Sequence, residues 1–146
     1  MNHIISILSS YNISKTKFRI NLLKLFYDSK KSLSVFEIAN SLSNSINKVT
    51  IYRALDAFEN KGLIHQVPDI KNIKRYSLCN LDGCNTNSHY NSHGHFICYS
   101  CNQTFCLESI SASNENLFKG FHVKEINLIA EGFCKNCYNN QYSSHL

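Results

Sequence analysis

Hydrophobic residues in the first half of the chain recur at helical spacing. The apolar residues of segment 17–27 fall three or four positions apart and predict an amphipathic helix. Ser34 and Glu37 have the spacing of a capping box and predict a second, short helix. Asn47 can cap a third helix, which Gly62 ends. The pattern therefore predicts three consecutive helices.

Two strands are predicted after the third helix. Segments 63–67 and 73–79 are the predicted strands, and Pro68, Asp69 and Asn72 between them are typical of a turn. Three helices followed by a hairpin make a winged helix, so we expect a mixed α+β protein with a winged-helix DNA-binding domain over residues 1–78.

The third helix of such a unit enters the major groove of DNA. Thr50, Tyr52 and Arg53 lie on it and are our candidates for contacts with bases and phosphates, together with Lys15 and Arg19. Taken alone, Tyr52 would rather be half-buried packing and Arg53 a solvated charge. Basic residues on both sides of the helix favour a surface that grips a duplex: Lys15, Lys17 and Arg19 before it, and Lys71, Lys74 and Arg75 at the hairpin tip.

Charge is distributed unevenly along the chain. Residues 1–75 contain 12 Lys or Arg and 5 Asp or Glu, a balance of +7, whereas residues 76–146 contain 3 and 5, a balance of −2. A solvated basic surface would explain the first half, but so would a module that faces phosphates. Together with the helix pattern, the asymmetry favours double-stranded DNA as the partner.

Four cysteines in the second half have the spacing of zinc ligands. They form two Cys-x-x-Cys pairs, Cys98 with Cys101 and Cys134 with Cys137. Each pair can hold one side of a tetrahedral zinc ion, and a zinc staple suits a small domain with few apolar residues. A redox dithiol is the alternative, but it needs only one pair and a βαβ pattern that is absent from the sequence. We therefore predict a structural zinc site.

Further cysteines and histidines predict a second metal site with a regulatory role. His93 and His95 alternate on a predicted strand, so both rings would lie on one side of it. Cys106 is a third candidate, although it could be a buried small hydrophobe. His65 and Cys79 stand at the start and end of the hairpin. An ion bound by groups from both halves would fix the angle between them, and in a symmetric homodimer it would set the spacing of the two DNA-reading helices.

Compartment can be judged from the apolar pattern. Met1 to Leu8 contain an apolar run without a basic flank or a small-residue cleavage site, and no segment approaches the length of a membrane span. Seven cysteines without an export signal favour metal ligation over disulfides. We expect a cytoplasmic protein with no membrane partner and no small-molecule substrate.

Several runs of sequence resemble the ferric uptake regulator (Fur) family, the bacterial metal-dependent repressors. They are Thr16-x-x-Arg19, Val49-Thr50-Ile51-Tyr52-Arg53-Ala54-Leu55, His93-x-His95-Phe96-Ile97-Cys98-x-x-Cys101 and Gly132-Phe133-Cys134-x-x-Cys137. The resemblance implies a DNA-binding domain, a hinge or loop over residues 79–92, and a small α/β dimerisation and metal-binding domain over residues 93–146. It also implies a structural zinc at the four cysteines and regulatory ligands at His93 and His95.

The same resemblance bears on which metal is sensed. Cys79 matches a hinge position that is glutamate in iron sensors and cysteine in zinc sensors, and His65 matches a ligand of zinc uptake regulators. Where iron and peroxide sensors place a histidine, the chain has Ser32. Thiolates favour zinc over iron or manganese. We expect a zinc-responsive repressor of metal-uptake genes that uses Zn²⁺, with Fe²⁺ or Mn²⁺ as alternative regulatory ions. An iron-responsive regulator, a peroxide sensor, a zinc-dependent enzyme and a structural zinc-ribbon adaptor are the other interpretations.

Overall fold

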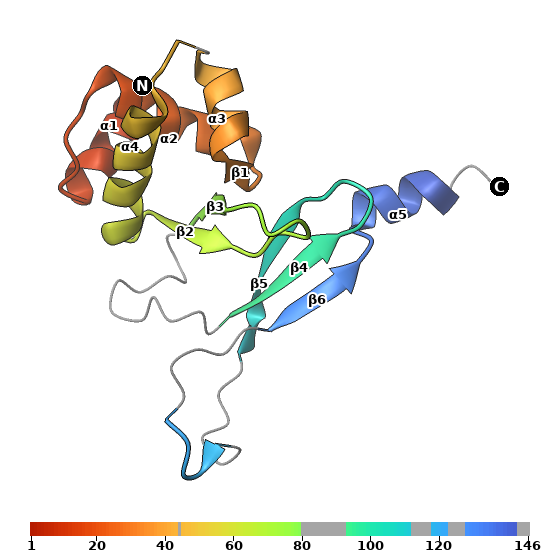
Figure 1. Ribbon diagram of the computed structural model, residues 1–146. Coiled ribbons are helices and arrows are strands. Elements are labelled where there is room, and N and C mark those ends of the chain that lie inside the picture. The colour runs from red at the N-terminus through yellow and green to blue at the C-terminus, as the bar shows by residue number, and fades with distance from the viewer. Residues whose placement is uncertain (44, 80–92, 112–117, 123–127, 143–146) are drawn as a thin grey trace.

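The computed structural model describes residues 1–43, 45–79, 93–111, 118–122 and 128–142. Four helices and a small sheet form an N-terminal unit, and a second sheet with one helix forms a C-terminal unit (Figure 1). Within these ranges no helix combines the length and the apolar character needed to cross a membrane. The predicted α+β class and the winged helix are confirmed.

Local capping explains the helices of the N-terminal unit. Helix α2 (Lys17–Ser29) begins at Thr16, whose side chain accepts a hydrogen bond from the Arg19 amide. Helix α3 (Val35–Leu42) begins with the complete capping box of Ser34 and Glu37. Asn47 caps helix α4 (Lys48–Asn60) by accepting from the Val49 amide. The three predicted helices are therefore confirmed.

The structure adds a helix at the start of the chain. Helix α1 (Asn2–Ser10) has no side-chain cap and no charge in its end turns, so the capping signals that predicted the other helices are absent from it. Its buried residues Ile4, Ile7 and Leu8 pack with the apolar faces of α2, α3 and α4 in one core. The apolar run at the start of the sequence is therefore a fourth helix that packs into the core of the N-terminal unit.

A three-stranded antiparallel sheet completes the winged helix. Strands β2 (Ile64–Val67) and β3 (Arg75–Leu78) form the predicted hairpin, and β1 (Leu33–Ser34) pairs with β3 to give the order β1-β3-β2. Gly62 has a φ of 77°, the left-handed conformation that lets the chain turn from α4 into β2 without steric cost.

The C-terminal sheet has two different faces. Strands β4 (His93–Cys98), β5 (Thr104–Ser111) and β6 (Ile129–Gly132) have the order β5-β4-β6, with β5 antiparallel and β6 parallel to β4, and helix α5 (Lys135–Tyr142) follows. Because side chains alternate along a strand, Thr104 and Cys106 lie on one face and Phe105 and Leu107 on the other. The first face meets the hairpin, where Thr104 Oγ1 donates a 2.7 Å hydrogen bond to the Pro68 carbonyl.

Candidate metal centres and nucleic-acid interface

The four predicted structural cysteines converge at one end of the C-terminal sheet. Cys98 ends β4, Cys101 lies in the turn to β5, Cys134 directly precedes α5, and Cys137 lies in the first turn of that helix. Their sulfurs are all within 4.8 Å of one another, and Cys101 and Cys134 are 4.0 Å apart. Thiolates at 2.3 Å from a tetrahedral zinc are about 3.8 Å apart. The cluster therefore fits a structural zinc site.

Backbone amides make Cys98 a good thiolate. Burial alone would raise the pKa of its thiol, but hydrogen bonds from the amides of Cys101, Cys134 and Ser100 lower it to about 6. The Cys134 amide lies 3.3 Å from the Cys98 sulfur. Burial and the neighbouring thiols raise the pKa of Cys101 to about 12. The four sulfurs can all be thiolates together only with a cation among them, which agrees with the chemistry of a zinc site.

A second cluster joins the two units. His65 on β2, His95 on β4 and Cys106 on β5 place one ligand atom each within 4.8 Å of one another. His95 and Cys106 are cross-strand partners, and His65 reaches them from the hairpin, with its Nε2 atom 3.2 Å from the Cys106 sulfur. The His65 and His95 ring centroids are 5.9 Å apart. The hairpin and the C-terminal sheet therefore supply ligand atoms to one point.

Cys79 lies on the other side of the His65 ring. Its buried sulfur is 3.3 Å from Nδ1 of His65, whereas Nε2 faces Cys106. The side chain of His93 lies outside the described residues, although its backbone opens β4. The structure thus brings together three of the five predicted regulatory ligands and places Cys79 beside one of them.

The donor set of the second cluster is chemically selective. A thiolate favours zinc over iron among the metals that imidazole binds, whereas carboxylates and water suit manganese better. Neither Asp nor Glu belongs to either metal-ligand cluster among the described residues. Glu108, which follows on β5, has a side chain outside the described residues.

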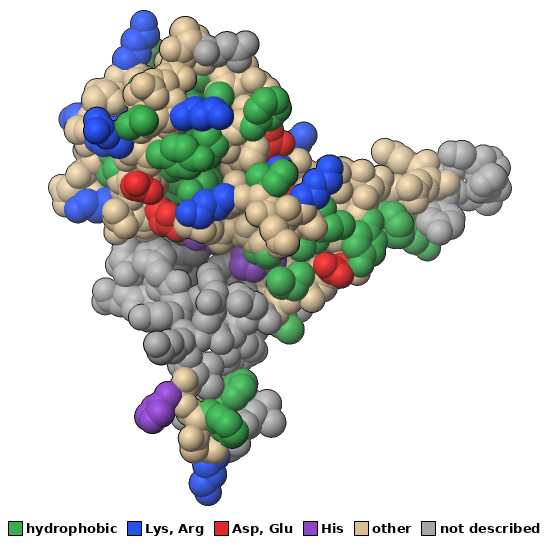
Figure 2. Space-filling view, in the orientation of Figure 1, with side chains coloured by type: hydrophobic (Ala, Val, Ile, Leu, Met, Phe, Trp, Pro, Cys, Tyr) green, Lys and Arg blue, Asp and Glu red, His purple; other side chains and the backbone are tan. Residues whose placement is uncertain are grey.

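The outer face of α4 carries the predicted DNA-binding residues. Thr50, Tyr52 and Arg53 are exposed, while Ile51 and Leu55 of the same helix are fully buried. Lys15 is exposed as well, and Arg19 is half-buried, with its guanidinium bonded to Ser14. Most Lys and Arg side chains visible in Figure 2 lie over this N-terminal unit. The predicted DNA-binding residues are therefore accessible, but Arg19 is only partly so, because its guanidinium is hydrogen-bonded to Ser14 in the preceding loop.

Arg75 corrects the prediction of a basic hairpin tip. Its side chain is buried, and Nε donates to Ser32 Oγ at 3.2 Å while a terminal nitrogen donates to the Glu37 carboxylate at 3.0 Å. The Asp69 carboxylate lies 3.7 Å away. Arg75 therefore fastens the hairpin to helix α3 and is not available to DNA, whereas Lys71 and Lys74 are exposed. Sequence reasoning missed this network, because its partners are up to 43 residues apart.

One cluster of four cysteines and one of two histidines and a cysteine lie at a sheet that is joined to a winged helix. This combination is the architecture of a metal-binding transcriptional regulator. The family model described as the ferric uptake regulator family matches residues 11–131. The chain belongs to the ferric uptake regulator family. Members of this family regulate transcription, so the chain is a metal-responsive DNA-binding regulator and not an enzyme.

Similar proteins include both iron and zinc regulators. The ferric uptake regulation protein of Synechococcus elongatus is 27% identical over 131 residues, which cover 84% of each chain. The ferric uptake regulator of Francisella tularensis with iron is 27% identical, with 86% of this chain and 95% of that one covered and a TM-score of 0.58. A zinc uptake regulator complexed with zinc and DNA is 21% identical, with 96% and 93% covered and a TM-score of 0.69.

Proposed function

We propose that the protein is a zinc-responsive repressor that binds an operator in double-stranded DNA when a regulatory zinc ion is present. The observation that supports this most strongly is the cluster of His65, His95 and Cys106. Its ligand atoms come from the hairpin of the winged helix and from the C-terminal sheet, so an ion bound there fixes one unit against the other. That geometry links metal binding to the position of α4.

Zinc is the proposed regulatory ion because of the donors. A thiolate and two imidazoles form a borderline-soft site, and His93 is our proposal for a further ligand from the same strand. Ser32 stands where iron sensors carry a histidine, and its hydroxyl is instead bonded to Arg75. An iron-responsive regulator is the second candidate, since the ferric uptake regulator of Francisella tularensis with iron shares the fold and is 27% identical, against 21% for the zinc uptake regulator complexed with zinc and DNA.

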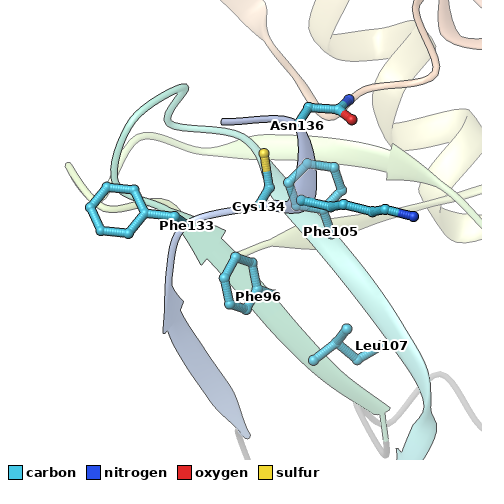
Figure 3. A pocket seen from close by; sticks show the side chains of 7 residues that line it. Phe96, Phe105, Leu107, Phe133, Cys134 and Asn136 are labelled. Atoms are coloured by element: carbon cyan, nitrogen blue, oxygen red, sulfur yellow. The ribbon is translucent and has the colours of Figure 1, made fainter. Parts of the chain in front are cut away.

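A homodimer is the proposed assembly. The face of the C-terminal sheet opposite the hairpin carries an apolar pocket of about 370 Å³, into which Phe96, Phe105 and Leu107 project beside Phe133 and Cys134 (Figure 3). Phe105 and Phe133 are 41% and 45% exposed. A second copy that covers this face would bury apolar surface.

DNA contacts are proposed for Thr50, Tyr52 and Arg53 on α4, with Lys15 and Arg19 on the phosphates. Arg53 can bond a guanine edge or a phosphate, and the Tyr52 ring offers an apolar contact to bases. The boundaries 1–78, 79–92 and 93–146 for the DNA-binding domain, hinge and dimerisation domain remain predictions.

Metal titration tests the proposed function. Protein that retains only its tight zinc is titrated anaerobically with Zn²⁺, Fe²⁺ or Mn²⁺ at buffered free concentrations, and binding to a zinc-uptake promoter fragment is followed by fluorescence anisotropy. We expect zinc to activate binding at the lowest free concentration, and Cys106→Ala to weaken that response by at least about tenfold. Activation by iron at a lower physiological concentration, or metal-independent binding, would contradict the zinc assignment.

A further inference from the structure

A hydrogen bond fastens the hairpin of the winged helix to the C-terminal sheet without the help of a metal ion. The Oγ1 atom of Thr104, the first residue of β5, donates to the carbonyl oxygen of Pro68 at 2.7 Å. Pro68 directly follows β2, and Thr104 is only 5% exposed, so water has little access to this hydroxyl. The bond is therefore a direct contact between the two units that uses none of the regulatory ligands.

This bond and the second metal cluster join the same two elements at separate points. His65 and Pro68 are three positions apart on the hairpin, and their partners Cys106 and Thr104 are two positions apart on one face of β5. A strand advances by about 3.3 Å per residue, so the two contacts are roughly 7–10 Å apart. One contact alone leaves the hairpin free to swing about that point, whereas two contacts fix its direction on the sheet.

The two units are otherwise joined over a limited area. Among the described helices and strands, every extensively packed pair lies within one unit, and none of these pairs joins the N-terminal unit to the C-terminal sheet. Domains that share a small interface move relative to one another unless specific contacts hold them. The fraction of zinc-free molecules in which the hairpin is seated on the sheet therefore depends on individual contacts, and the bond from Thr104 to Pro68 is one of them.

We propose that Thr104 is a positioning residue that sets how strongly the zinc-free protein binds its operator and how tightly the regulatory site binds zinc. Its hydrogen bond favours the seated arrangement, which is also the one that brings His65 to His95 and Cys106. When only a fraction of the molecules is competent to bind, the apparent affinity is reduced by that fraction. Zinc bound by all three ligands holds the seated arrangement by itself. This inference rests on the proposed function.

Loss of the bond affects the zinc-free and the zinc-bound protein differently. It lowers the seated fraction of the zinc-free protein, so zinc-free DNA binding and zinc binding weaken by the same factor. The DNA affinity of the zinc-saturated protein stays unchanged, because the ion then seats the hairpin. The ratio of the two DNA affinities therefore increases. A hydrogen bond of ordinary net strength corresponds to a factor of roughly 2 to 12.

Thr104→Val tests this role, because it keeps the branched shape of the side chain and removes the hydroxyl. Binding to the promoter fragment is measured anaerobically by fluorescence anisotropy, with the regulatory site empty and with it saturated by zinc, and zinc affinity is measured by competition with a chromophoric chelator. We expect Thr104→Val to weaken zinc-free DNA binding and zinc binding equally, by at least about threefold, and to leave zinc-saturated DNA binding unchanged. Thr104→Ser keeps the hydroxyl, and as the matched control it should behave like the unaltered protein.

Small-angle X-ray scattering gives a second readout that does not depend on DNA. We expect zinc-free Thr104→Val to have a larger radius of gyration than the zinc-free unaltered protein, and the two zinc-saturated proteins to scatter alike. If Thr104→Val changes neither zinc-free DNA binding nor zinc affinity, or weakens zinc-saturated DNA binding as well, the bond does not position the hairpin and this inference is wrong. If the unaltered protein binds no second zinc ion, or binds DNA equally with and without zinc, the proposed function itself fails.

Discussion

The two candidate metal sites differ in how accessible their individual cysteine ligands are. Cys98 is fully buried, and three backbone amides donate to its sulfur, so its position is fixed by the fold. Cys106 is only partly buried and lines a cavity of about 200 Å³ between the winged helix and the C-terminal sheet. A buried, preorganised thiolate holds its ion tightly, whereas an accessible one exchanges it. We therefore expect the first site to keep its ion and the second site to exchange it.

Replacement of Cys98 by Ser tests this difference. The hydroxyl is a much poorer zinc ligand, and a structural zinc can contribute about 10 kcal/mol of apparent folding free energy. We expect Cys98→Ser to lose the tight zinc ion and to unfold its C-terminal sheet at a markedly lower temperature. Zinc content by mass spectrometry and thermal unfolding by circular dichroism measure both effects. Cys106→Ser is the control, and it should keep the tight ion; loss of that ion from both variants would refute the division of roles.

At the scale of elements, one buried arginine holds the winged helix together. Arg75 on β3 bonds to Ser32 before β1 and to Glu37 on α3. Its replacement by Met leaves these partners without their donor. Since the Glu37 side chain is 39% exposed, water compensates part of the loss, and we expect a destabilisation of about 2 kcal/mol. Urea unfolding measures it. Lys74→Met, at an exposed position one residue away, should change stability by less than about 0.5 kcal/mol.

The same network makes the stability of the N-terminal unit depend on pH. Burial alone would raise the pKa of Glu37, but hydrogen bonds from the Ser34 amide and the Arg75 guanidinium lower it below its usual value. A carboxyl with a lowered folded-state pKa stabilises the fold above its unfolded pKa and loses that contribution as the pH falls through the folded value. We expect Glu37→Gln to flatten the loss of stability below pH 5 in urea unfolding. An unchanged acid limb would contradict this role.

Elements with local signals could be predicted from the sequence, and elements with distant partners could not. Helices α2, α3 and α4 each have a cap and an apolar face within a few residues. Helix α1 has no cap and is held by the core that other helices build. The burial of Arg75 depends on a carboxylate 38 positions away, so its sequence neighbours Lys71 and Lys74 made it resemble a surface charge.

The candidate sites follow the same division. The cysteine pairs were recognisable because both ligands of a pair lie within one turn, and the structure brings all four together. His65 and Cys106 are 41 positions apart, so their residue types suggested a shared site but no local spacing did, and the structure places the His65 Nε2 atom 3.2 Å from the Cys106 sulfur. Cys79 lies on the Nδ1 side of the His65 ring, whereas Cys106 lies on the Nε2 side. This arrangement depends on the orientation of the ring, which the spacing of residues along the sequence does not determine.

For the whole molecule, the shared cluster predicts how metal and DNA act on each other. Because His65 belongs to the hairpin and His95 and Cys106 to the C-terminal sheet, an ion bound by all three restricts the angle between the units. If one angle suits the operator, metal tightens DNA binding, and DNA must then tighten metal binding by the same factor. Couplings of this kind typically amount to about 1–3 kcal/mol, or roughly 5- to 150-fold.

The coupling can be measured from both directions. Zinc affinity of the regulatory site is determined with and without a saturating operator duplex, and DNA affinity with and without zinc, at one salt concentration. We expect both ratios to agree, and His65→Ala to bring them close to one, because the ion then loses its ligand from the hairpin. Lys119→Ala, at an exposed position of the C-terminal unit, should leave both ratios unchanged. A full coupling in His65→Ala would mean that the hairpin receives the metal signal by another route than this ligand.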